Sequence, residues 1–354
     1  MPRLPLIAVL CTLPGLSMAQ DPAPTDPPGA RSTSGAIETG IAWLLRHQEE
    51  AGGWSASQFQ RHDPKNDLCT GTGKPDQDLH VTAFATLALL TRGITERQGR
   101  EGYSGQLQKA LAWLLSQQQA DGFLGTPEAG NAVEAHALAT LALVEGKGLS
   151  DKPLPEEPLK WLVKRRLPDG TWPLRVDDKQ GDPMATYWAT IALMSGAAFS
   201  GNRLDLEPTL ATMAAGTAAP SPAAETMLRW MAVHTPAKDA RLAEQLAKLA
   251  KQPPRWREGA EAAQMDFLDW HLGTMAMFQA GGTEWQQWYP ALLAALVPHQ
   301  RTDGAHAGSW DPVDARGAQG GRVYATAVNV MALAAGQRFG RIVADRKAGA
   351  GAKK

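Results

Sequence analysis

The chain has little cysteine and almost no net charge. Its 354 residues include only two cysteines, Cys11 and Cys69, while 35 lysines and arginines stand against 36 aspartates and glutamates. Because Cys11 lies in the N-terminal leader described below, we expect the mature chain to retain one cysteine and no intramolecular disulfide. The formal charge of −1 lacks the basic excess typical of nucleic-acid partners. We therefore expect no nucleic-acid binding, and a fold stabilised by packing.

Long apolar runs are absent outside the N-terminus. Arg3 precedes an apolar segment over residues 4–16, and small residues follow it up to Ala19, which is the arrangement of a cleaved signal peptide. No later run reaches the roughly 18 apolar residues that a membrane-spanning helix needs. We expect residues 1–19 to be removed, and the protein to be periplasmic or secreted with no integral membrane segment.

Composition separates the two ends of the chain from its middle. Residues 20–34 are rich in proline and polar side chains, which predicts a flexible leader. Residues 343–354 are rich in glycine, alanine and lysine, which predicts a disordered tail. The middle is apolar enough for a sizeable core. We therefore expect one folded domain over residues 35–342.

Two kinds of apolar pattern alternate within that domain. One has apolar residues at helical spacing on a single face and predicts an amphipathic outer helix. The other is apolar nearly all round and predicts a buried inner helix. Outer segments lie at 37–45, 107–116, 158–163, 206–215, 239–251 and 284–297, and inner segments at 81–90, 135–143, 187–194, 223–233, 265–280 and 323–335.

Six alternating pairs of outer and inner helices close naturally into a double ring. We therefore predict an all-α fold, an (α/α)6 toroid with a central cavity. An open solenoid of helical hairpins is the alternative architecture. In the ring, the inner helices run in the same direction and begin at the same mouth of the cavity.

The turns after the outer segments carry a family resemblance. Residues 48–54, from Gln48 to Trp54, fit Q-x-x-x-G-x-W, and weaker copies follow at 118–124, 166–172 and 300–306. The pattern resembles the QW repeat of squalene and oxidosqualene cyclases. The chain is similar to exported prenyltransferase/squalene-oxidase repeat proteins of the terpenoid cyclase and protein prenyltransferase superfamily. The resemblance implies an α/α toroid in which Gln48 and Trp54 are structural.

The catalytic motifs of that superfamily are incomplete in this chain. Squalene-hopene cyclases use D-x-D-D, because protonating an alkene needs a strongly acidic carboxyl group. The nearest match is D-Q-D-L at residues 76–79, where Leu79 replaces the last aspartate. Prenyltransferases hold zinc with Asp, Cys and His, whereas Cys69 has no D-x-C spacing. We therefore expect neither a metal nor another cofactor.

Polar residues stand at or near the starts of the inner segments, and a common mouth would bring them together. Asp78, Glu134 and Asp269 also fit a helix start that complements the helix dipole, and a histidine such as His136 is often a hydrogen-bonded core residue. The candidate catalytic residues are Asp76, Asp78, His80 and Asp269. The candidate cavity-binding residues are Glu134, His136, Tyr187, His271, Arg322 and Tyr324. Glu225 is a further polar residue near the start of an inner segment.

The densest functional pattern covers residues 303–312 and 320–327. There, Gly320, Gly321 and Arg322 precede the last inner segment, an arrangement that suits either an anion at a helix N-terminus or a long structural turn. In the repeat proteins that the chain resembles, a similar pair of segments, matching G-S-W-D-P at residues 308–312 and G-G-R-x-Y at residues 320–324, closes the ring.

Two functions fit these observations. The preferred hypothesis is a toroid that binds an extended or apolar ligand in its cavity, either a small molecule, a lipid or a peptide, or else a protein partner. The alternative is a cavity enzyme. It would be a terpenoid-cyclase-like isomerase or transferase, or a polysaccharide lyase or hydrolase that uses Asp266 and Asp269 as an acid/base pair.

Overall fold

The computed structural model describes residues 32–94, 103–150, 152–200, 208–209, 211–212, 221–232 and 238–351. Within these ranges the chain forms helices and irregular connections, with one isolated bridge between Gln118 and Leu124. The outer helices are α2 (Thr33–Arg46), α4 (Tyr103–Ser116), α6 (Glu156–Arg165), α10 (Ala240–Ala250) and α12 (Gly282–Leu296). The inner helices are α3 (Asp78–Thr91), α5 (Ala132–Leu149), α7 (Pro183–Ser200), α9 (Pro222–Ala232), α11 (Phe267–Ala280) and α13 (Gly317–Gly351). Short 3-10 turns cover Phe59–His62, Pro75–Gln77, Gly259–Gln264, Val297–His299 and Gly304–His306.

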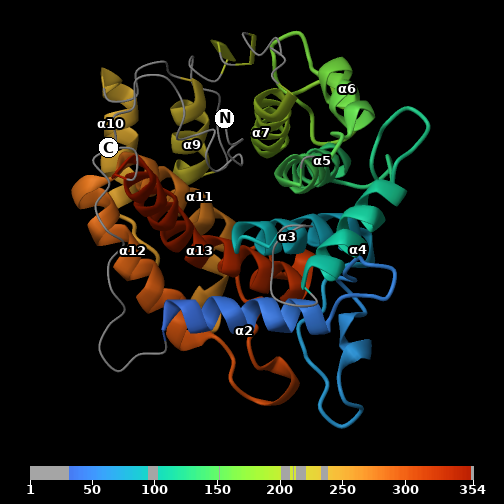
Figure 1. The fold of residues 1–354 in the computed structure, drawn as a ribbon, viewed down its shortest axis with the longest axis vertical. Coiled ribbons are helices and arrows are strands. Elements are labelled where there is room, and N and C mark those ends of the chain that lie inside the picture. Colours follow the sequence, from blue (N-terminus) through green and yellow to red (C-terminus); the bar gives the residue numbers. More distant parts are fainter. Residues whose placement is uncertain are drawn as a thin grey trace.

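The inner helices form a closed ring. Each contacts the next in the order α3, α5, α7, α9, α11 and α13, and α13 contacts α3 again. Figure 1 shows the outer helices at the periphery, and each of them contacts two neighbouring inner helices. The predicted all-α toroid is therefore confirmed, and the contact of α13 with α3 excludes an open solenoid. The outer helix predicted at 206–215 falls mainly outside the described residues.

The ends of the chain were predicted separately from the ring. Residues 1–31, which include the predicted signal peptide and most of the leader, lie outside the described residues. The predicted tail at 343–354 overlaps the end of α13, which extends to Gly351.

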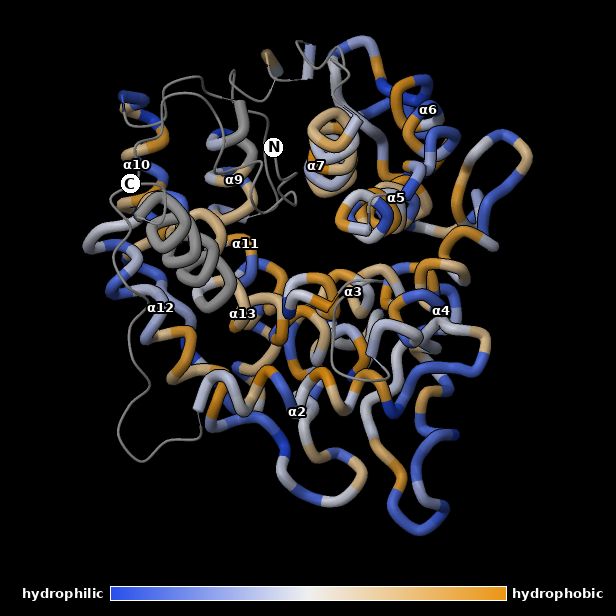
Figure 2. Tube along the Cα trace, in the orientation of Figure 1, coloured by the Kyte–Doolittle hydropathy of each residue, from blue (hydrophilic) through white to orange (hydrophobic). Residues whose placement is uncertain are grey.

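The two rings differ in how much of each helix is buried. Every residue of α3 from His80 to Thr91 is buried, whereas α10 buries only a stripe that includes Leu242 and Leu249. Figure 2 shows the same contrast in hydropathy between inner and outer helices. Each buried Leu, Val or Phe side chain contributes about 1.5–3 kcal/mol, so the inner ring supplies most of the apolar burial.

Aromatic side chains meet across the middle of the inner ring. The ring of Phe84 on α3 lies 5.9 Å from Trp188 on α7 and 5.7 Å from Tyr324 on α13. Because α5 stands between α3 and α7 in the order of the inner helices, the contact of Phe84 with Trp188 crosses the interior of the inner ring. At this level the centre of the toroid is packed with aromatic side chains, which stabilise it by edge-to-face contacts.

Three tryptophans join the outer helices to the inner ones with the same geometry. Each indole N–H donates to a carbonyl in the last turn of the preceding outer helix, where the carbonyls lack i+4 partners within the helix. Each tryptophan's backbone N–H donates to a threonine hydroxyl on the next inner helix. The indole bonds are Trp54 to Leu44 O (2.7 Å), Trp172 to Leu162 O (2.8 Å) and Trp310 to Leu296 O (2.8 Å), and the threonines are Thr82, Thr186 and Thr326.

Two glutamine side chains tie adjacent outer helices together. Gln48 Nε2 donates to the carbonyl of Gln106 on α4 at 2.9 Å. Gln300 Nε2 donates at 2.8 Å to the carbonyl of Ala36 in α2, and at 2.8 Å to the carbonyl of Gly308. The bond from Gln300 to Ala36 joins the last unit of the chain to the first, so Gln300 closes the outer layer.

The inner layer is closed by glycine backbones. Gly321, which interrupts α13, has a φ of 64°, and a Cβ built on it would stand 2.4 Å from the backbone nitrogen of Gly73. This close approach lets Arg322 N–H donate to Gly71 O at 2.8 Å and Lys74 N–H donate to Gln319 O at 2.7 Å. A side chain at position 321 would separate the first and last units.

We expect Gln300→Ala to lower the free energy of unfolding by about 1–3 kcal/mol, because it removes the buried hydrogen bonds from Gln300 to the carbonyls of Gly308 and Ala36. Gln118→Ala is the matched control, since Gln118 is exposed. Urea unfolding of both variants measures the difference, and equal midpoints would show that Gln300 does not hold the closure.

Candidate functional site

A cavity of about 380 Å³ opens at the N-terminal ends of α3, α5 and α13. Its size falls within the range of small-molecule sites in proteins. Segments from four parts of the sequence contribute to it because the ring closes. Its walls include Lys74, Asp76, Gln77, His80, Asn131, Glu134, Leu174, Arg316, Gln319 and Tyr324.

His80 and Glu134 form the most deeply buried polar pair on the cavity wall. His80 Nε2 lies 3.6 Å from Glu134 Oε1, and both atoms are buried without a hydrogen-bond partner. Burial opposes ionisation of Glu134, but His80 and Arg316 together hold the pKa of Glu134 below its usual value. The wall therefore presents a carboxylate and an imidazole whose two facing atoms have hydrogen-bonding capacity that the surrounding side chains leave unused.

A second charged pair stands beside the first. Arg316 Nε donates to Asp266 Oδ2 at 3.1 Å, and Asp266 Oδ1 accepts the backbone N–H of Asp269 at the start of α11. Burial raises the pKa of Asp269 to about 6, although the Ser221 hydroxyl donates to this carboxyl. Asp269, predicted as a catalytic residue, therefore does not line the cavity; Asp266 stands between it and the wall residue Arg316.

Asp314 is buried behind the cavity and touches its wall. Its Oδ2 accepts the hydroxyl of Tyr324 at 3.2 Å and the backbone N–H of Phe267 at 3.1 Å. Burial, followed by a smaller effect of Asp266, raises the pKa of Asp314 to about 6. A carboxyl group with such a pKa exchanges protons near neutral pH.

The structure gathers part of the predicted site. Asp76, His80, Glu134 and Tyr324 line the same cavity although they lie far apart in the sequence. This convergence follows from the shared direction of the inner helices.

Asp78 has a different environment from Asp76. Its Oδ1 accepts the backbone N–H of Ala56 at 2.8 Å and lies 3.4 Å from the Ser55 hydroxyl. Burial raises the pKa of Asp78 despite these hydrogen bonds. Asp78 therefore anchors the turn after Trp54, and it also lines a second cavity of about 470 Å³ that Asp76 shares.

His136 lies between the two rings rather than on the wall of either cavity. Its Nδ1 accepts the backbone N–H of Leu124 at 2.9 Å, and its ring stacks on Phe123 and meets the edge of Trp161. Burial lowers its pKa to about 3. His136 takes the place that threonine hydroxyls occupy in three other units, so its position is explained by packing.

Arg322 is used in closing the ring. Its guanidinium donates to Thr70 O at 2.7 Å and to Ser309 Oγ at 2.9 Å, and it forms an ion pair with Asp311. These partners occupy the side chain, which is 1% exposed. The arrangement is the long structural turn rather than an anion site.

The remaining predicted residues stay apart from the wall of the cavity. Tyr187 is buried against Trp188, which raises its pKa, and His271 is buried on α11, which lowers its pKa to about 4. Glu225 pairs with Arg241 on α10 and accepts from Gln245, so it points toward the outer layer.

Three residues of the site and its surroundings carry no signal in the sequence that marks them as functional: Arg316, Asp314 and Asn131. The first two lie in the gap between the two halves of the dense pattern at 303–327, where no periodicity marks them. Asn131 precedes α5 as an ordinary loop residue, and its side chain reaches Gln77 of the first unit at 3.2 Å.

Solved structures share this fold. The apo type II terpene cyclase MstE from Scytonema matches with a TM-score of 0.57 and 15% identity, over 86% of this chain and 98% of that one. A variant of MstE in complex with geranylgeranyl dihydroxybenzoate matches with a TM-score of 0.54 and 16% identity, over 86% and 97%. A protein from Actinoplanes matches with a TM-score of 0.51 and 17% identity, over 87% and 99%. The chain thus has a terpenoid cyclase-like α/α toroid fold.

No protein-family model and no curated protein sequence matches the chain. Among the described helices, none combines the length and the apolar character needed to cross a membrane.

Raised carboxyl pKa values predict how stability changes with pH. A folded-state pKa of about 6 for Asp314, above the ordinary 3.8, means that folding favours the protonated carboxyl, so stability falls as the pH rises from 4 to 6. Asp314→Asn should remove this contribution. We expect the unfolding free energy of the variant, relative to the unchanged protein, to rise by about 1–3 kcal/mol between pH 4 and pH 7. Urea unfolding at both pH values measures it, and a constant difference would contradict a raised pKa.

Proposed function

We propose that the protein is a ligand-binding toroid that takes a small molecule into the cavity at the N-terminal ends of α3, α5 and α13. The observation that carries the proposal is that His80 Nε2 and Glu134 Oε1, which lie 3.6 Å apart on the cavity wall, are both buried and make no hydrogen bond to a described residue. A buried polar atom without a partner costs about 1–3 kcal/mol. A ligand that supplies hydrogen bonds to both atoms recovers that free energy.

The wall chemistry defines the kind of ligand. The ionised Glu134 accepts hydrogen bonds, while Arg316, Lys74 and Asn131 donate them, so the head of the ligand carries hydroxyl and carboxyl or amide groups. Leu174 and the ring of Tyr324 offer apolar contact to the rest of the molecule. The likeness to MstE, one structure of which holds geranylgeranyl dihydroxybenzoate, supports prenylated aromatic acids as the first class of ligand to test.

A cavity enzyme is the second candidate, and Asp314 favours it. Its carboxyl group, with a pKa of about 6, accepts a hydrogen bond from Tyr324 on the cavity wall. An acid with a pKa near the working pH suits general acid catalysis. In this candidate the protonated form of Asp314 turns its O–H toward the Tyr324 oxygen. Tyr324 gives its hydroxyl proton to the substrate and takes the carboxyl proton of Asp314 in its place, while Glu134 stabilises the developing positive charge.

Binding is tested with dihydroxybenzoates that carry geranyl, farnesyl or geranylgeranyl chains, by titration calorimetry. We expect Glu134→Gln and His80→Ala to weaken binding about tenfold or more, equivalent to about 1.4 kcal/mol. Glu128→Gln is the matched control, because Glu128 is exposed and lines only the second cavity. Equal affinities for all variants would refute the proposed site.

The same mixtures separate the two candidates. Mass spectrometry and chromatography after incubation detect a product isomer if the protein is an enzyme, and Asp314→Asn then abolishes its formation. Recovery of unchanged ligand supports the binding toroid.

Export is a further part of the proposal. The apolar segment at 4–16 and Ala19 support cleavage after residue 19. We expect N-terminal sequencing of the protein, expressed with its leader in a Gram-negative host and taken from the periplasmic fraction, to begin at Gln20. An intact Met1 on cytoplasmic protein would contradict export.

A further inference from the structure

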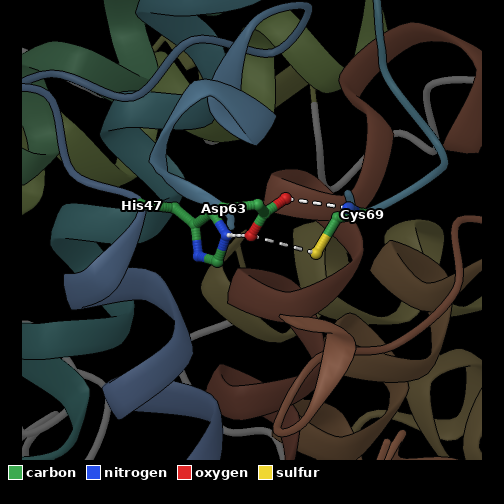
Figure 3. Close-up of side chains that lie close together, drawn as sticks. All are labelled: His47, Asp63 and Cys69. Carbon is green, nitrogen blue, oxygen red and sulfur yellow. Dashed lines mark hydrogen bonds and ion pairs between the residues drawn. The ribbon is translucent and has the colours of Figure 1, made fainter. Parts of the chain in front are cut away.

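We infer that His47, Asp63 and Cys69 form a zinc site. Figure 3 shows the three side chains directed toward one another, from the end of α2 and the loop that follows it. His47 is 1% exposed, Cys69 is fully buried and the Asp63 side chain is 2% exposed. None of them lines either cavity, so the site is independent of the proposed ligand site.

The three side chains converge closely enough to share one ion. His47 Nε2 lies 2.7 Å from Asp63 Oδ1, and Cys69 Sγ lies 3.5 Å from the same oxygen. All three potential ligand atoms lie within 4.8 Å of one another. Zinc bonds of about 2.0–2.3 Å place tetrahedral ligands roughly 3–4 Å apart, so a small widening of the His47–Asp63 contact admits the ion.

The surroundings select which atoms face the centre. His47 Nδ1 lies 2.8 Å from the carbonyl of Trp43, and since a carbonyl only accepts, Nδ1 carries the proton and Nε2 offers its lone pair. Asp63 Oδ2 accepts the backbone N–H of Cys69 at 2.8 Å, which leaves Oδ1 to face His47. Stacking of Trp43 on the imidazole at 3.9 Å holds the ring. Such outer contacts are typical of metal-ligating histidines and carboxylates.

A bound cation also explains why His47 Nε2 and Asp63 Oδ1 lie so close together. The lone pairs of His47 Nε2 and Asp63 Oδ1 repel each other at 2.7 Å unless a cation lies between them. A proton between them would be shared by His47 Nε2 and Asp63 Oδ1 alone, whereas a metal ion would also bind the sulfur of Cys69. The nearby thiol therefore favours the metal.

The donor set and charge select zinc. Nitrogen, oxygen and sulfur donors together suit this borderline ion. On binding, the Cys69 S–H proton leaves to solvent as the Zn–S bond forms, and the thiolate and the Asp63 carboxylate then balance the two positive charges. A water molecule supplies the fourth donor of a tetrahedral site.

The loop that carries these ligands also holds the ring closed. Asp67 Oδ2 accepts the backbone N–H of Ala305 at 2.7 Å, and Thr70 N–H donates to His306 Nε2 at 3.1 Å. Zinc bound at His47, Asp63 and Cys69 fixes this loop to the end of α2. The ion thereby strengthens the join between the first and last units.

Cobalt substitution tests the site in the full chain, with Cys11→Ser as the background so that Cys69 is the sole thiol. We expect about one cobalt or zinc ion per chain, and a thiolate-to-cobalt charge-transfer band that zinc abolishes. Cys69→Ser should remove the band, and His47→Ala should weaken binding about tenfold or more. His62→Ala is the matched control, because its ring lies 6.5 Å from that of His47 but outside the cluster.

A measurement on the background protein itself keeps the inference testable if a variant fails to fold. Metal analysis and thermal unfolding before and after chelator treatment should show loss of zinc together with a midpoint lower by several degrees, restored by added zinc. Absence of the cobalt band in the folded background protein, with no effect of chelator or zinc on unfolding, would overturn the zinc site and leave a buried ion pair.

Discussion

Closure of the ring is the constraint on which the rest of the structure depends. Several joins achieve it, among them the amide of Gln300, which reaches the first outer helix, and the glycine backbones at 71–73 and 320–321, which pass each other at near-minimum distance. Without these joins, α3 and α13 would no longer contact each other, and the apolar faces that they bury against each other would be exposed. A closed ring buries apolar surface on every unit equally, whereas an open stack leaves two unprotected ends.

The cavity exists because of this closure. His80 and Glu134 come from consecutive inner helices, but Arg316 and Tyr324 come from the last, and only the contact of α13 with α3 places them opposite each other. The charges of the wall are thus assembled from the two ends of the domain. The pKa of Glu134, lowered by His80 and Arg316 against the effect of burial, is a property of the assembled ring rather than of any local sequence.

Periodicity in the sequence predicted the helices and their layers because burial on one face or on all faces leaves a direct trace in residue spacing. It also placed His80, Glu134 and Tyr324 near helix starts, from which the ring brings them together. It could not separate His136 from them, because an imidazole that accepts a backbone N–H between the two rings looks the same in sequence as one on a cavity wall. Arg322 was misleading for a similar reason, since its partners Thr70 and Asp311 are defined only by closure. The cluster of His47 with Asp63 and Cys69 escaped detection because its spacing follows an irregular loop.

The aromatic contacts of Phe84 with Trp188 and Tyr324 affect whether a small molecule could pass through the centre of the ring. Phe84 also meets the edge of His80, so this aromatic cluster packs behind two residues of the cavity wall, His80 and Tyr324. If the proposed ligand binds in the cavity, this packing opposes its passage through the ring, so that the ligand enters and leaves through one opening with its polar head inward. The part of a long prenyl chain that exceeds the cavity of about 380 Å³ would then stay outside it, in contact with water.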